Sequence, residues 1–120
     1  LDKVEKHCPD AFSHPTNTFI DPGCGDGQFL GEVLIRKLQN GIDFETALST
    51  IFGLDLMSDN CELCRERLLC GREDLRHIVE NNIVCADALR YNYRFVKGEH
   101  PYDDEKKQLD FENRWAACFE

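Results

Sequence analysis

The chain has 120 residues, 42% of them apolar and 31% charged, and a formal net charge of −9 at pH 7. This size and composition indicate one globular domain and exclude a disordered chain. No apolar run approaches the ~20 residues needed to cross a bilayer, so we expect no membrane contact. Lysine and arginine are scattered among acids, as on solvated helix faces, and form no basic patch that would hold nucleic acid.

The start of the sequence and its cysteines indicate where the chain works. The sequence opens with LDKV, without Met and without an apolar secretory leader, so we expect a fragment or a tag-cleaved chain in the cytoplasm. Seven cysteines in that setting predict free thiols. Cys61 and Cys64 form one CxxC pair, but a zinc site needs four ligands, and these two fall one turn apart in a helical pattern. We therefore expect them to pack as small hydrophobes and expect no metal site.

Hydrophobic periodicity and turn residues predict an alternating order of helices and strands. In chain order these are a helix over 1–8, a strand over 18–22, a helix over 27–39, a short helix over 44–50, a strand over 51–56, a helix over 59–70, one or two helical turns around 75–79, and a short buried strand over 83–85. Asp43 and Ser58 are predicted N-caps, and Gly41 and Gly71 are predicted helix ends. The predicted apolar side of the helix over 59–70 consists of Cys61, Leu63, Cys64, Leu68 and Leu69.

This order also predicts the architecture. Strands that alternate with helices pair in parallel through right-handed crossovers. We therefore expect a Rossmann-like α/β fold, a partial doubly wound sheet of three to four mainly parallel strands flanked by helices. Residues 97–109 are polar and lack periodicity, and 110–120 lack a capping signal, so we expect a loop-rich tail over 97–120.

A glycine-rich loop joins the strand over 18–22 to the helix over 27–39. Gly23 and Gly25 let the backbone approach a ligand, Gly27 starts the helix, and Asp21 can receive a cationic group such as an ammonium. The third glycine comes one residue earlier than in the GxGxxG fingerprint of dinucleotide-binding proteins. The alternative is a tight strand–helix turn without a ligand.

Two further acids follow strands in the same way. Asp55 ends the strand over 51–56, and Asp87 follows the strand over 83–85. Because ligands bind beyond the carboxyl ends of parallel strands, the loop and both acids are expected to line one crevice. Both acids also fit ordinary turns. The two residues after Asp55, Leu56 and Met57, fit either the wall of this crevice or the core.

Three stretches resemble motifs of one family. FIDPGCGDGQFLGEVL looks like the first motif, often Asp-Pro-x-Cys-Gly-x-Gly-x-Phe-Leu, of the amino-group DNA methyltransferases, which use S-adenosylmethionine to methylate an exocyclic amine of adenine. IFGLDLMSDNCELCRERL looks like their second motif and NIVCADAL like their third. The resemblance covers roughly residues 16–90. It implies a class I methyltransferase fold with S-adenosylmethionine as the cofactor, in a single domain over 1–120.

The resemblance implies a role for each matching residue. It places the methionine ammonium near Asp21, makes Asp55 the acceptor of the ribose hydroxyls, and makes Asp87 the acceptor of the adenine amine. It also sets Leu56 and Met57 against one face of the adenine ring. The implied cofactor-binding set is Asp21, Pro22, Gly23, Cys24, Gly25, Gly27, Phe29, Asp55, Leu56, Met57, Asp87 and Ala88.

The catalytic motif of this family is missing from the sequence. That motif, Asn/Asp-Pro-Pro-Tyr/Phe, holds the target amine, but the prolines of this chain are never adjacent. The closing WAACFE looks like the lead-in to the strand that carries the motif, so we expect truncation before it. We identify no catalytic residue, and we expect DNA contact only through missing regions or a partner subunit.

Two functions remain open at this point. One is the cofactor-binding portion of a methyltransferase that is inactive alone. The other is a stand-alone module that sequesters S-adenosylmethionine or completes a split enzyme, and the flanking gene sequence would discriminate them. In either case a half-sheet with a bare edge predicts association, as a homodimer.

Overall fold

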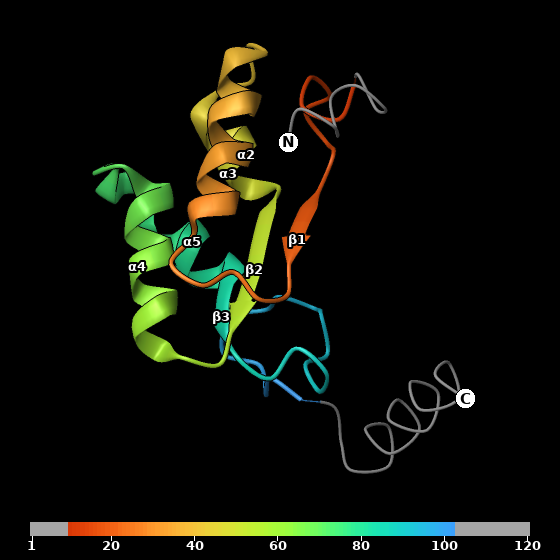
Figure 1. Cartoon of the computed structure of the whole chain (residues 1–120), viewed down its shortest axis with the longest axis vertical. Helices are drawn as coiled ribbons and strands as arrows, with labels where there is room; N and C mark the ends of the chain where they lie inside the picture. Colours follow the sequence, from red (N-terminus) through yellow and green to blue (C-terminus); the bar gives the residue numbers. More distant parts are fainter. Residues whose placement is uncertain (1–9, 103–120) are drawn as a thin grey trace.

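The centre of the protein is an open sheet of three parallel strands (Figure 1). The computed structural model describes residues 10–102. The strands lie in the order β1-β2-β3 and comprise β1 (Phe19–Asp21), β2 (Ile51–Asp55) and β3 (Ile83–Cys85). Phe19 pairs with Ile51, and Gly53 pairs with Ile83. The predicted α/β class, with parallel strands flanked by helices, is confirmed.

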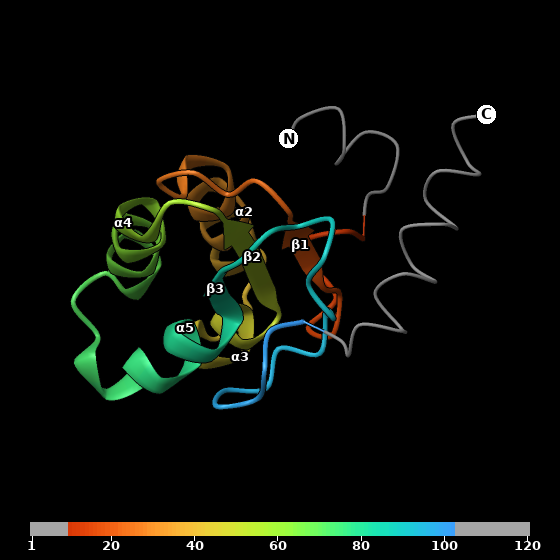
Figure 2. The ribbon, with the colours of Figure 1, turned by 90° about the horizontal axis from the view of Figure 1, so that it is seen from below.

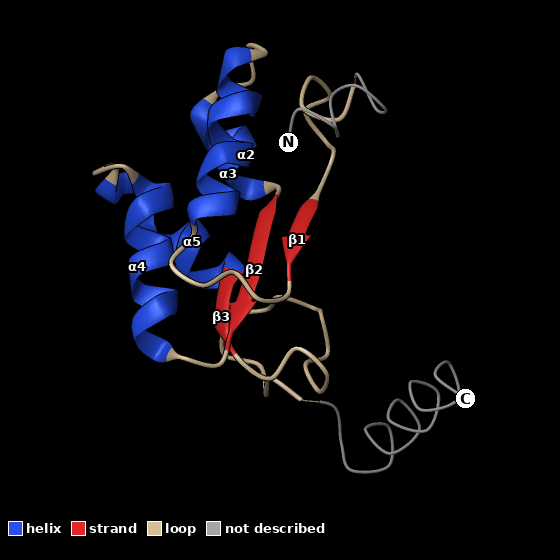
Figure 3. Ribbon diagram, in the orientation of Figure 1, coloured by secondary structure: helices blue, strands red, loops and turns tan. Residues whose placement is uncertain are grey.

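Helices connect the strands as predicted (Figure 3). The described residues form α2 (Gln28–Gln39), α3 (Phe44–Ser49), α4 (Ser58–Leu69), the 3-10 turn η1 (Glu73–Leu75) and α5 (Arg76–Asn82). The helices α2, α3 and α4 begin and end within one residue of the expected positions. η1 and α5 lie where one or two helical turns around 75–79 are expected. The predicted helix over 1–8 and the predicted tail beyond residue 102 lie outside the described residues.

The predicted helix ends are right in all but one case. Asp43 caps α3, because its carboxylate accepts the Thr46 N–H at 3.1 Å. Gly41 and Gly71 have φ of +86° and +80°, the left-handed backbone that commonly ends a helix. The prediction for Ser58 is wrong, since α4 begins at Ser58 itself and no side chain caps it.

The two faces of the sheet are covered differently (Figure 2). Alternate residues of a strand point to opposite faces. Ile51 and Ile83 pack in one cluster with the buried side chains of the helices. Leu54 packs in a second cluster with the non-helical segment 86–102, whose contributing residues are Ala86, Ala88, Tyr91, Phe95 and Tyr102. After β3, this segment runs back across the sheet and covers the face opposite the helices.

The apolar side of α4 is narrower than expected. Cys61 and Cys64 are fully buried, which confirms that they pack as small hydrophobes, and burial raises the pKa of Cys61 to about 12. Leu63 is 56% exposed, because Cys61, Cys64 and Leu68 already form the inward face at helical spacing. β3 is also less buried than expected, with Ile83 inside and Cys85 exposed. Between residues 10 and 102, no helix is both long and apolar enough to cross a membrane.

Candidate functional site

A cavity lies beyond the carboxyl ends of the strands, where a parallel sheet binds ligands. Its volume is about 410 Å³. β1 supplies the glycine loop, β2 ends in Asp55, and β3 is followed by Asp87. The lining residues are Pro22, Gly23, Asp55, Leu56, Met57, Asn60, Ala86, Asp87 and Ala88. Three positions far apart in the sequence therefore meet at one site.

The glycines of the loop differ in their surroundings. A Cβ on Gly27, where φ is +89°, would lie 2.8 Å from Cys64 Sγ and 3.0 Å from its Cα. Gly27 therefore lets α4 approach the loop. Gly25 has φ of +54° and open space around it, and a Cβ on Gly23 would meet no atom within 4 Å. Gly23, which lines the cavity, therefore has no side chain that would occupy the cavity space.

Asp55 joins the loop, the β2–α4 turn and α4. Its Oδ1 accepts the Met57 N–H at 2.8 Å and the Asn60 side-chain amide at 3.3 Å. Its Oδ2 accepts the Gly25 N–H at 3.0 Å. The hydrogen bond from Met57, helped by those from Asn60 and Gly25, lowers the pKa of Asp55 below its ordinary value of 3.8.

This lowered pKa predicts a loss of stability in acid. The unfolded chain binds the Asp55 proton at a higher pH than the folded chain does. The stabilisation is therefore complete above pH 3.8 and is lost as the pH falls through the lower folded value. In Asp55→Asn we expect the free energy of unfolding to fall less steeply over this range, measured by urea unfolding at several pH values. Equal slopes in both proteins would contradict this contribution.

Two tyrosines hold the turn after β3. The Asp87 N–H donates to the Tyr102 hydroxyl at 3.1 Å, and the Tyr93 hydroxyl donates to the Ala88 carbonyl at 2.7 Å. Asp87 Oδ1 accepts the Leu89 N–H at 3.0 Å. Neither tyrosine's role could be predicted from the sequence, because both lie in a segment without periodicity.

The structure brings part of the predicted set to the cavity wall. Leu56 and Met57 are 70% and 57% exposed, so they are not core residues. The predicted residues that do not line the cavity are Asp21, Cys24, Gly25, Gly27 and Phe29. The Asp21 carboxylate accepts a hydrogen bond from the Gly23 N–H at 3.1 Å, within the glycine loop. Cys24 is buried beneath the loop, and its hydrogen bond with Cys64 raises its pKa.

The cavity wall is acidic. Its polar side chains belong to Asp55, Asn60 and Asp87, and no lysine, arginine or histidine lines it. The described part of the chain contains no cluster of three or more histidines, cysteines or acids that could hold a metal ion. Such a wall suits hydroxyl groups, amines and cations, whereas it repels phosphates.

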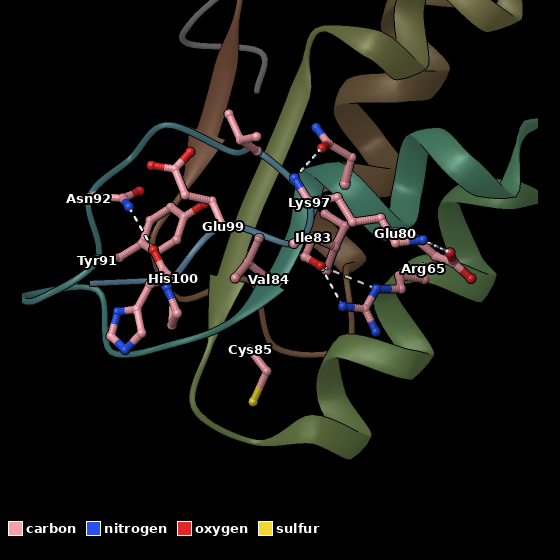
Figure 4. A pocket seen from close by; sticks show the side chains of 14 residues that line it. Arg65, Glu80, Ile83, Val84, Cys85, Tyr91, Asn92, Lys97, Glu99 and His100 are labelled. Atoms are coloured by element: carbon pink, nitrogen blue, oxygen red, sulfur yellow. Dashed lines mark hydrogen bonds and ion pairs between the residues drawn. The ribbon is translucent and has the colours of Figure 1, made fainter. Parts of the chain in front are cut away.

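A second, smaller cavity of about 170 Å³ lies beside β3 (Figure 4). Arg65 of α4 donates through its guanidinium to the Ile83 carbonyl and so covers part of this sheet edge. Lys97 pairs with Glu80 at 2.7 Å. Because these charged groups pair with one another or with the backbone, the second cavity offers less to a polar ligand than the first.

Comparison with protein-family models, curated proteins and solved structures finds no match for this chain.

Proposed function

We propose that the chain binds S-adenosylmethionine in the cavity beyond the strand ends, as the cofactor-binding portion of a methyltransferase. The methyltransferase class is that of the DNA adenine enzymes that its motifs resemble. The observation that carries the proposal is the acidic, cation-free wall that adjoins an open glycine loop. In this proposal Asp55 accepts from the ribose and Asp87 from the adenine amine, and both line the cavity. Asp21, at the end of β1 and next to the lining residue Pro22, receives the ammonium.

Charge separates this ligand from its main competitor. S-adenosylmethionine carries a sulfonium and an ammonium, which carboxylates attract. A nicotinamide dinucleotide carries a pyrophosphate, for which the cavity wall offers no lysine, arginine or histidine. Leu56 and Met57 offer exposed apolar surface that the adenine ring can cover.

Titration calorimetry tests the proposal directly. We expect heat of binding with S-adenosylmethionine and S-adenosylhomocysteine and none with a nicotinamide dinucleotide. Heat with the dinucleotide alone would reject the proposal.

Methyl transfer to DNA is not expected from this chain. Transfer requires the amine to be held in line with the sulfonium carbon, and the sequence lacks the motif that holds it. This also suits the second candidate, a stand-alone binding module or subunit. The assay measures labelled methyl incorporation into mixed-sequence DNA, with a full-length methyltransferase as positive control. Incorporation that disappears in Asp21→Ala would contradict the expectation.

Within residues 10–102, no strand pairs with the outer edge of β1, and this edge supports self-association. Phe19 donates its N–H toward β2, so the backbone groups of Ile20 point away from β2. The Ile20 side chain is 48% exposed. Such an edge pairs readily with another strand, and the acidic repulsion is screened beyond about 10 Å at ordinary salt. We expect a homodimer by light scattering at micromolar concentration, and a uniform monomer mass would contradict it.

A further inference from the structure

The Asp55 carboxylate has little acceptor capacity left for a ligand. An ionised carboxylate offers about four lone-pair sites. Met57 and Asn60 fill both sites on Oδ1, and Gly25 takes one on Oδ2. One site on Oδ2 therefore remains, whereas a ribose presents two neighbouring hydroxyls.

Asn60 is placed to serve the second hydroxyl. It lies in the first turn of α4, lines the same cavity and directs its amide nitrogen to Asp55 at 3.3 Å. Its amide oxygen and second N–H form no hydrogen bond with the described residues. The third polar side chain of the cavity wall belongs to Asp87, which follows the neighbouring strand β3 and is assigned to the adenine amine. Asn60 is therefore the remaining polar side chain for the second hydroxyl.

We infer that Asn60 is a specificity-determining residue for the ribose. The inference rests on the proposed function. Asp55 accepts one ribose hydroxyl through Oδ2, and the Asn60 amide bonds to the other. The chain then distinguishes ribose from deoxyribose through two side chains, one for each hydroxyl.

The experiment removes the hydroxyls and the amide separately. Calorimetry measures the affinity of the full chain for adenosine, 2′-deoxyadenosine and 3′-deoxyadenosine. We expect the native chain to prefer adenosine by about 10- to 150-fold over the analogue that lacks the hydroxyl bound to the charged Asp55 carboxylate. We expect a preference of about 3- to 10-fold over the analogue that lacks the hydroxyl bound to the neutral Asn60 amide. In Asn60→Ala the preference over one analogue falls to near unity, and the preference over the other stays. Ser58→Ala, in the same turn but outside the cavity wall, keeps both preferences.

Each result has a definite meaning. If both preferences persist in Asn60→Ala, the inference fails while the proposed function stands. If the native chain binds neither S-adenosylhomocysteine nor adenosine, both fail. Asn60→Ser provides a second variant should Asn60→Ala lower the melting temperature, and it too should reduce one preference only.

Discussion

Gly27→Ala is expected to destabilise the protein by about 2–5 kcal/mol. A left-handed backbone costs a residue with a Cβ about 1–2 kcal/mol, and forcing an atom into a packed site typically costs about 1–3 kcal/mol more. The added methyl would meet Cys64 Sγ at 2.8 Å and the Cys64 Cα at 3.0 Å. The backbone atom cannot turn aside, so α4 must move away from the loop. Urea unfolding measures the loss.

The neighbouring glycines provide matched controls. Gly25→Ala carries the left-handed strain without a clash, so we expect a loss of about 1–2 kcal/mol. Gly23→Ala carries neither, and we expect a change within about 0.5 kcal/mol. Its methyl would occupy space that we assign to the ligand, so it should weaken S-adenosylhomocysteine binding while leaving the fold intact. Equal losses in Gly27→Ala and Gly25→Ala would contradict the packing account.

Asp55→Ala is expected to weaken binding of S-adenosylhomocysteine by about 1.5–3 kcal/mol, the range for a hydrogen bond to a charged group. The lost interaction is the one between Oδ2 and a ribose hydroxyl. The substitution also removes the acceptor of the Gly25 N–H, which loosens the loop. Calorimetry measures the affinity.

Asp55→Asn separates the losses at Oδ2 from damage to the β2–α4 turn, because the amide nitrogen that replaces Oδ2 accepts neither the Gly25 N–H nor a ribose hydroxyl. Its remaining oxygen can still accept from Met57 and Asn60, so the β2–α4 turn is kept. We expect binding to weaken in this variant as well. If Asp55→Ala leaves the affinity unchanged while Asp21→Ala abolishes it, the ribose assignment is wrong.

The sequence predicted the elements that depend on local pattern. Strand ends, helix spacing and the glycine loop could be read from the chain, because periodicity and turn chemistry act over a few residues. The cap at Ser58 failed because Asp55, three residues earlier, holds the same turn. The prediction that Leu63 is buried failed because Cys61, Cys64 and Leu68 already fill the inward face of α4.

The parts of the site that were missed depend on tertiary contacts. Asn60 joins the cavity only because α4 begins beside the end of β2, and nothing in its own neighbourhood marks it. Tyr93 and Tyr102 support the turn after β3 from a segment that returns over the sheet. Such contacts follow from the assembled fold and not from local pattern.

The most direct test of the proposed site is a titration of the ¹⁵N-labelled chain with S-adenosylhomocysteine, followed by amide chemical shifts. We expect shifts at the amides of Gly23, Met57 and Ala88, which line the cavity beyond the strand ends. We expect no shifts at Lys97 and Gly98, which line the smaller cavity beside β3. An unchanged spectrum, or shifts confined to the smaller cavity, would contradict it.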